Sequence, residues 1–140
     1  MLTAYPRSPI IFAREMPTCA DFYLWRDARP EWLGSLALDG YPSGIPQRLR
    51  REGDPLAFRD LVHQFLERRD DGILPRQGWP WRWVGSGQSN YVYALRETGL
   101  LVAAQGRGWL PIAEAIADKR RLLTMPVLIF PKMSPTRSRT

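Results

Sequence analysis

The chain has 140 residues, a hydrophobic fraction of 44% and a formal net charge of +6. This length suits one domain with one core. No apolar run approaches the roughly 20 residues that a membrane-spanning helix needs, so the composition favours a small globular domain and argues against a membrane protein.

The cysteine content and the charge distribution narrow the class further. Cys19 is the only cysteine, which excludes an intramolecular disulfide and makes a cysteine-based zinc site unexpected. The first residues have neither a basic leader nor a long apolar stretch, so we expect a cytoplasmic protein. Half of the charge excess, +3, lies in residues 131–140, whereas nucleic-acid-binding modules usually concentrate charge on a folded face.

Arginine outnumbers lysine by 18 to 2, and Asn90 is the only asparagine. A GC-rich genome explains the arginine bias by itself. The scarcity of asparagine and the 13 prolines also fit a thermophilic origin, because labile amides are disfavoured and rigid loops are favoured at high temperature. Both interpretations stay open.

The first third of the chain predicts an arm and a β-hairpin. Residues 1–19 are punctuated by prolines and are expected to form an N-terminal arm. Residues 21–38 contain two aromatic and aliphatic runs around a polar connection, which is typical of a hairpin. Thr18 and Asp21 also fit a variant capping box that would begin a helix. We favour the hairpin because Pro30 would stop that helix after about three turns.

A compound turn and two helical segments follow. In residues 39–44, Asp-Gly is expected to supply a positive φ and Tyr-Pro an extended step. Residues 46–52 predict a short basic helical turn. A longer helix is expected to start with Asp54 as N-cap and Pro55 at the first helical position and to end near residue 71. Its buried stripe is formed by Phe58, Leu61, Val62 and Phe65.

The second half of the chain contains a tryptophan-rich stretch and predicts further strands and a helix. In residues 79–83 three tryptophans alternate, and an extended strand would present them all on one side. Residues 85–90 predict a flexible turn of the hairpin type, and residues 91–104 a second hairpin. A helix is expected over residues 110–122, and an apolar run at 127–130 predicts a buried strand.

These elements predict a single α+β domain over residues 1–130, followed by a disordered basic tail at 131–140. The order is strand pair, helix, strand pair, helix, strand. We therefore expect an antiparallel sheet built from two hairpins plus a C-terminal strand, with two main helices on one side.

One motif carries a resemblance. The turn Asp39-Gly40-Tyr41-Pro42-Ser43-Gly44 and the later Tyr91-Val92-Tyr93 are similar to features of a group of small phage and bacterial proteins without an assigned chemistry. In that group a hairpin is followed by a D-G-Y-P-S-G turn and a helical segment, so the resemblance covers about residues 22–66. The chain departs from the group at Leu38, where Trp is usual, and at Pro46, where Gly is frequent. The resemblance implies the fold and a phage-like origin.

In size and in its Arg- and Trp-rich composition, the chain also resembles early proteins of Thermus phages. This likeness of type implies a protein that binds host RNA polymerase near the β-flap and the σ factor, suppresses host promoters and promotes antitermination. It assigns no role to any residue.

The sequence offers no sound catalytic candidate. His63 is the only histidine and lies beside the predicted apolar stripe, so we interpret it as a surface or boundary residue. We interpret Cys19 as a packed thiol and Asp70-Asp71 as a solvated helix end. The G-S-G at residues 85–87 lacks the spacing and the lysine of a phosphate-binding loop. We therefore predict no catalytic residue, no cofactor, no metal site and no enzyme activity.

The candidate binding residues are arginines and tryptophans. One group lies shortly after the D-G-Y-P turn, where an arginine cluster could pair with carboxylates or phosphates or could form a solvated face. The tryptophan stretch could cover a sheet face, anchor a protein interface or stack on single-stranded bases. The basic tail with residues 119–121 could also contact an acidic protein or nucleic acid, although Arg120 and Arg121 also suit a helix C-terminus. The predicted partner-binding residues are Arg48, Arg50, Arg51, Trp79, Trp81, Arg82 and Trp83.

Two main hypotheses follow. The first is a non-enzymatic, phage-type regulator that binds host RNA polymerase with its σ factor and changes promoter and terminator response, with auxiliary nucleic-acid contact and no membrane contact. The second is a nucleic-acid-binding module of phage or plasmid origin. A small nuclease-like enzyme ranks last. The sequence leaves the oligomeric state open.

Overall fold

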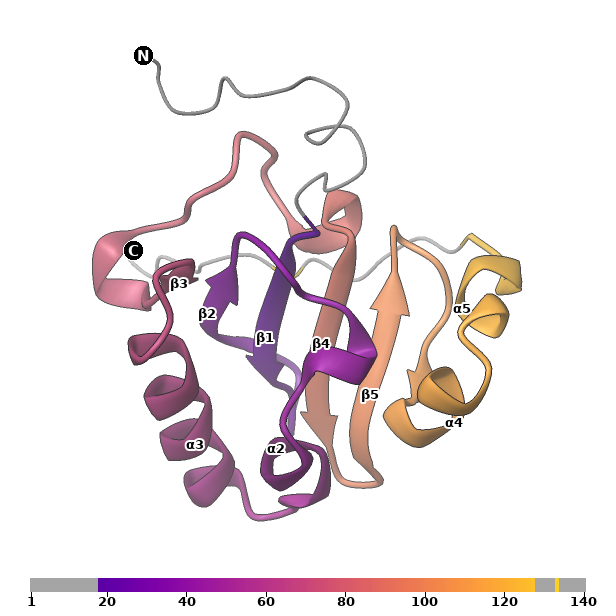
Figure 1. Cartoon of the computed structure of the whole chain (residues 1–140), viewed down its shortest axis with the longest axis horizontal. Coiled ribbons are helices and arrows are strands. Elements are labelled where there is room, and N and C mark those ends of the chain that lie inside the picture. The colour runs from indigo at the N-terminus through magenta and orange to yellow at the C-terminus, as the bar shows by residue number, and fades with distance from the viewer. Residues whose placement is uncertain (1–17, 128–132, 134–140) are drawn as a thin grey trace.

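The computed structural model describes residues 18–127 and Met133. In this part of the chain one six-stranded mixed sheet is combined with four α-helices (Figure 1), which confirms the predicted α+β class. Across the sheet the strands are β3 (Gly72–Ile73), β2 (Glu31–Leu36), β1 (Ala20–Leu24), β4 (Tyr91–Arg96), β5 (Gly99–Ala104) and β6 (Leu110–Pro111). The helices are α2 (Gln47–Arg51), α3 (Pro55–Glu67), α4 (Ile112–Ala117) and α5 (Arg120–Thr124), and the 3-10 turns are η1 (Pro42–Gly44), η2 (Pro75–Gln77) and η3 (Ser86–Gln88).

Both predicted hairpins are confirmed, and the alternative helix at Thr18 is wrong. β1 pairs antiparallel with β2, and β4 pairs antiparallel with β5. The hairpins join through β1 and β4, which run parallel from Ala20 opposite Tyr91 to Leu24 opposite Leu95. The sequence predicted an antiparallel sheet, and this prediction is wrong for the pairing of β1 with β4, which is parallel. β1 has a neighbouring strand on each edge and side chains in a hydrophobic cluster on each face, and all five of its residues are buried.

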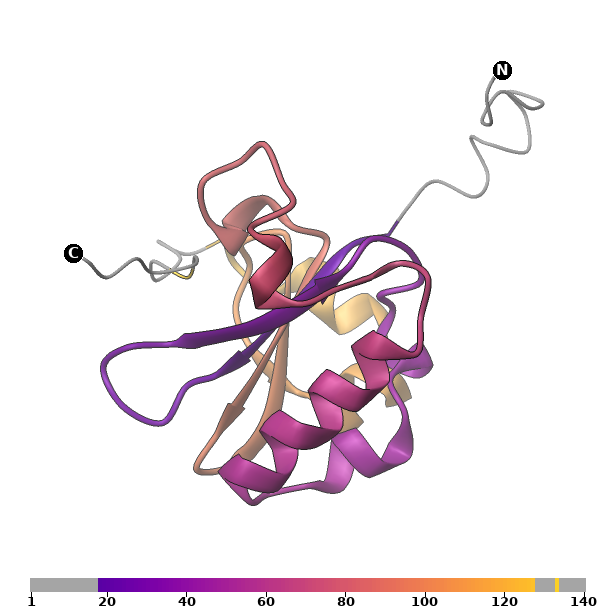
Figure 2. The same ribbon diagram turned by 90° about the vertical axis from the view of Figure 1, so that its left-hand side faces the viewer.

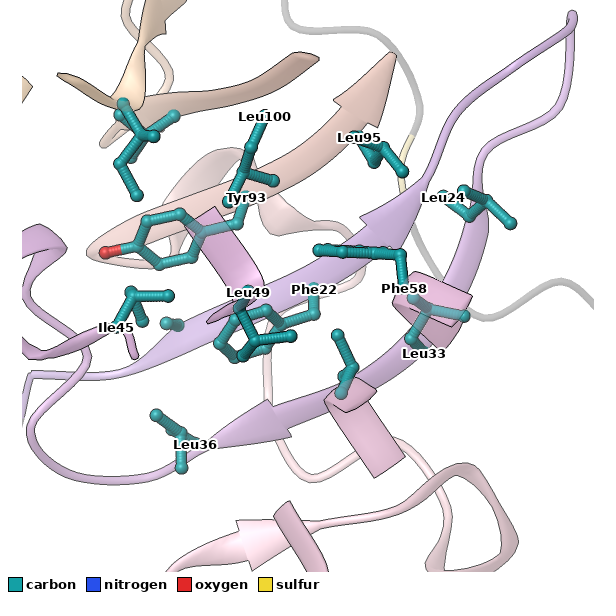
Figure 3. Close-up of a cluster of buried hydrophobic side chains, with 14 of the residues drawn as sticks. Phe22, Leu24, Leu33, Leu36, Ile45, Leu49, Phe58, Tyr93, Leu95 and Leu100 are labelled. Atoms are coloured by element: carbon teal, nitrogen blue, oxygen red, sulfur yellow. The ribbon is translucent and has the colours of Figure 1, made fainter. Parts of the chain in front are cut away.

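The helix after Asp54 forms with the predicted N-cap, but it ends at Glu67, and Leu61 and Phe65 of the predicted buried stripe are only half-buried. The Asp54 carboxylate accepts a hydrogen bond of 2.9 Å from the backbone N–H of Ala57, and Pro55 is the first residue of α3. Phe58 and Val62 are buried together with Leu66. This face of α3 packs into the larger of two hydrophobic clusters, which also takes side chains from α2, α4, α5 and the sheet. Figure 2 shows α3 lying to one side of the sheet, and Figure 3 shows part of the cluster, with Leu49 of α2 and Phe58 of α3 near Phe22 of β1.

The C-terminal part differs from the predictions. The helix expected over residues 110–122 is divided into α4 and α5, because Asp118 leaves the helical conformation and its carboxylate accepts a hydrogen bond of 3.2 Å from the backbone N–H of Arg120. Of the predicted strand at 127–130, the structure describes only Val127, which forms an isolated bridge with Arg107. The arm at 1–17 and the tail, apart from Met133, lie outside the described residues.

The D-G-Y-P-S-G turn is fitted against the start of the sheet. Asp39, not Gly40, has the positive φ, at 55°. Gly40 meets a spatial requirement instead: a Cβ there would lie 2.7 Å from the Cβ of Ala20 and 2.8 Å from the carbonyl oxygen of Thr18. Its N–H donates to that Thr18 oxygen at 2.8 Å, and its own carbonyl accepts from the Tyr93 hydroxyl at 2.6 Å. The two motifs that carry the phage-protein resemblance are therefore in direct contact.

We expect Gly40→Ala to destabilise the fold by about 2 kcal/mol, because the added methyl group must displace the backbone at the start of β1. Gly53→Ala is the matched control, since a Cβ at Gly53 would meet nothing within 4 Å. Denaturant unfolding of both variants measures the difference. Equal stability of the two variants would contradict this account of Gly40.

Candidate interaction surface

The face of the sheet away from the larger cluster gathers the tryptophans. A smaller buried cluster of Tyr23, Val92, Ala94 and Met133 lies there, with Trp25, Trp32 and Trp109 packed against it. Trp79 meets Trp32 edge-on, with ring centroids 5.1 Å apart, and Trp81 stacks on Trp83 at 5.4 Å. All six tryptophans of the chain therefore contribute to one aromatic layer.

Residues 79–84, here called the tryptophan segment, do not form the strand that would have placed the three indoles on one side. The alternation nevertheless survives in an irregular backbone. The three tryptophans are half-buried, while the residues between them are exposed, Val84 to 79%. These exposed residues, Pro80, Arg82 and Val84, form what we call the outward row.

A buried carboxylate lies beneath the segment. Asp21 in β1 is fully buried and accepts four hydrogen bonds. Its Oδ1 accepts from the Ser35 hydroxyl at 2.6 Å and from the Trp81 indole N–H at 2.7 Å. Its Oδ2 accepts from the Ser86 and Ser89 hydroxyls, both at 2.6 Å. Each oxygen thus has two donors, which compensates for its removal from water.

The three serines in turn accept hydrogen bonds from aromatic side chains. Trp32 donates its indole N–H to Ser35 and Trp83 donates to Ser89, both at 3.0 Å. The Ser86 hydrogen is directed at Asp21, so the Tyr23 hydroxyl is the donor in the 2.9 Å contact with Ser86. Every polar hydrogen of this network is therefore donated either to Asp21 directly or to a serine that itself donates to Asp21. Each of these donors has an acceptor.

Burial raises the pKa of the Tyr23 phenol well above its ordinary value, and the nearby Asp21 raises it further, against a lowering by the Ser86 hydrogen bond. Burial also raises the pKa of the Cys19 thiol. That thiol is buried and donates to the side-chain oxygen of Asn90 at 3.3 Å. Among the described residues, no three His, Cys, Asp or Glu side chains are gathered in a way that could hold a metal ion.

The predicted partner-binding residues fall into two groups that lie far apart in the structure. Trp79, Trp81, Arg82 and Trp83 share the tryptophan segment, whereas Arg48, Arg50 and Arg51 lie on α2. α2 and the tryptophan segment lie at opposite ends of the molecule in both views (Figures 1 and 2). Arg48 and Arg51 are exposed, but the Arg50 side chain donates to the Ile45 carbonyl at 2.9 Å and so serves the local fold.

Asp21 and the three serines were not among the predicted site residues. The available signal was an aspartate within the apolar run Ala20-Asp21-Phe22-Tyr23-Leu24, where a charge needs buried partners. The serines themselves carry no such signal, because their spacing from Asp21 along the chain follows no local rule.

Comparisons with known protein families, with curated proteins and with solved structures found no match to this chain. Within residues 18–127, no helix has both the length and the apolar character needed to cross a membrane.

We expect Tyr23 to stay neutral in the folded protein at pH about 11, where phenols of ordinary pKa, about 10, ionise. Wild type and Tyr23→Phe should then show the same rise in tyrosinate absorbance while folded. Unfolding returns the phenol to its ordinary pKa, so above pH about 10 the unfolded chain binds fewer protons and wild-type stability falls as the pH rises. This fall should be smaller in Tyr23→Phe. A smaller absorbance rise in the folded variant would show that Tyr23 ionises normally.

Proposed function

We propose that this chain is a non-catalytic regulatory protein that binds a macromolecular partner through the outward row of the tryptophan segment. The observation that carries the proposal is the division within this segment. The indoles are directed at the protein's own acceptors, and Arg82 and Val84 remain exposed beside half-buried aromatic rings. Tryptophan and arginine dominate the energetics of protein interfaces, where rigid anchors lose little entropy on binding.

The chemistry of the buried groups supports binding over catalysis. The four donors to Asp21 occupy the lone pairs that a general base would need. The Cys19 thiol is buried with a raised pKa, which is the opposite of an activated nucleophile.

For the partner, we propose RNA polymerase with its σ factor, in the cytoplasm of a bacterial host. The basis is the likeness of type to phage early proteins. The chain would occupy a surface near the β-flap and thereby change initiation and termination. Arg82 makes no ion pair with a described residue, so we expect it to face a carboxylate on the polymerase.

We expect Arg82→Glu to weaken binding to purified bacterial RNA polymerase holoenzyme by about 30-fold, the loss typical of a central interface residue. The matched control is Arg48→Glu, which makes the same charge change on exposed α2 and should leave affinity within about threefold. Calorimetric titration with each variant measures both values. Wild type that does not bind the holoenzyme would end the proposal of this partner, and equal losses in both variants would end the assignment of this surface.

A second function is favoured by one observation. Arg48 and Arg51 are exposed on α2 and make no ion pair with any described residue. Such a cationic end would suit phosphate contacts of a nucleic-acid-binding module.

If α2 binds nucleic acid, affinity for duplex DNA should fall steeply as salt rises, and Arg48→Glu together with Arg51→Glu should reduce the slope of log affinity against log salt by about two. Fluorescence anisotropy at several salt concentrations measures this slope. Under our main proposal the wild-type chain binds naked DNA only weakly, and tight, salt-sensitive binding would reverse our preference.

A further inference from the structure

The conformation of the tryptophan segment depends on few bonds. Residues 79–85 belong to no helix or strand, and their backbone groups make no backbone–backbone hydrogen bond with another described residue. The hydrogen bonds that hold the segment come from its indoles: Trp79 donates to the Trp83 carbonyl, Trp81 to Asp21 and Trp83 to Ser89.

Only the last two of these bonds connect the segment to the rest of the protein, and both lead to the same carboxylate. Trp81 reaches Asp21 directly at 2.7 Å, and Trp83 reaches it through the Ser89 hydroxyl. Ser86, in the turn that follows the segment, also donates to Asp21. Asp21 therefore holds the segment and the turn behind it against a strand at the centre of the sheet.

We propose that Asp21 is the positioning residue of the interaction surface: it holds the free protein in the form in which Pro80, Arg82 and Val84 face outward, ready for the partner. This rests on the proposed function for the use of the surface, whereas the holding of the segment is a property of the chain alone. A preformed surface binds more tightly, because its residues lose less conformational entropy when the partner binds.

The chemistry of the network explains why only a carboxylate serves here. Each Asp21 oxygen accepts from two donors, so replacing either oxygen with an NH₂ group sets that group against two donors. An indole N–H is a donor only and cannot reverse. The hydroxyls of Ser86 and Ser89 could rotate to accept from an NH₂ group, but their own hydrogens would then lose the carboxylate as acceptor while Tyr23 and Trp83 still donate to them. The amide of Asp21→Asn therefore leaves more donors than acceptors in the network.

The test compares Asp21→Asn with Asp60→Asn, the same change on the exposed face of α3. The indole N–H signals of the six tryptophans are followed by NMR. In Asp21→Asn we expect hydrogen exchange at Trp81 and Trp83 to be at least about tenfold faster, with Trp25 unchanged as the internal reference. Affinity for RNA polymerase holoenzyme should fall by at least about tenfold. Asp60→Asn should match wild type in both measurements.

Ser89→Ala is the second variant, in case Asp21→Asn does not fold. It removes one link and should accelerate exchange at Trp83 more than at Trp32, with Ser43→Ala on exposed η1 as its control. Unchanged exchange at Trp81 and Trp83 in a folded Asp21→Asn chain overturns the proposal, and so does faster exchange with unchanged affinity. If the wild-type chain does not bind the polymerase, the proposal of this partner is wrong. The exchange data alone then decide whether Asp21 holds the segment.

Discussion

The structure depends on a single buried carboxylate at its centre. A buried ionisable group costs several kcal/mol unless its lone pairs are filled, and Asp21 is fully buried in the second position of β1. Its four donors come from β2 and from residues 81–89, which are far from Asp21 in sequence. Burial of β1 therefore goes together with the docking of these segments, and the hydrogen-bond requirement of one side chain constrains an otherwise irregular stretch.

β1 connects the two layers on either face of the sheet, because its alternate side chains enter different clusters. Ala20, Phe22 and Leu24 enter the larger cluster, which contains the helical side chains. Asp21 and Tyr23 enter the aromatic layer on the opposite face. β1 is also paired on both edges, antiparallel with β2 and parallel with β4. The tryptophan segment thus rests on the most deeply buried strand, which gives an irregular loop a rigid base.

Local patterns could predict the elements but not their assembly. The hairpins and α3 follow from β-branched and aromatic runs, from the Asp54 cap and from a 3.6-residue apolar period. The parallel contact between β1 and β4 joins segments about 70 residues apart in the chain, and the two-residue strands β3 and β6 are too short to leave a periodic signal. The alternation of Trp79, Trp81 and Trp83 correctly indicated an inward and an outward side, although the backbone is not a strand. The serines that complete the site could not be predicted, because a hydroxyl gains its role only from what folding places beside it.

The D-G-Y-P-S-G turn has a structural role that is separate from the proposed interaction surface. Gly40 is required by its close approach to Ala20 and Thr18, and its carbonyl accepts the Tyr93 hydroxyl. The D-G-Y-P-S-G turn and the Tyr-x-Tyr strand thus stabilise one another within the fold. Proteins that share them would share this docking of a turn on a sheet, whatever they bind. Under the proposed function, partner choice would reside in residues on which the fold does not depend, and the outward row fits that description, because the side chains of Pro80, Arg82 and Val84 are exposed between half-buried indoles.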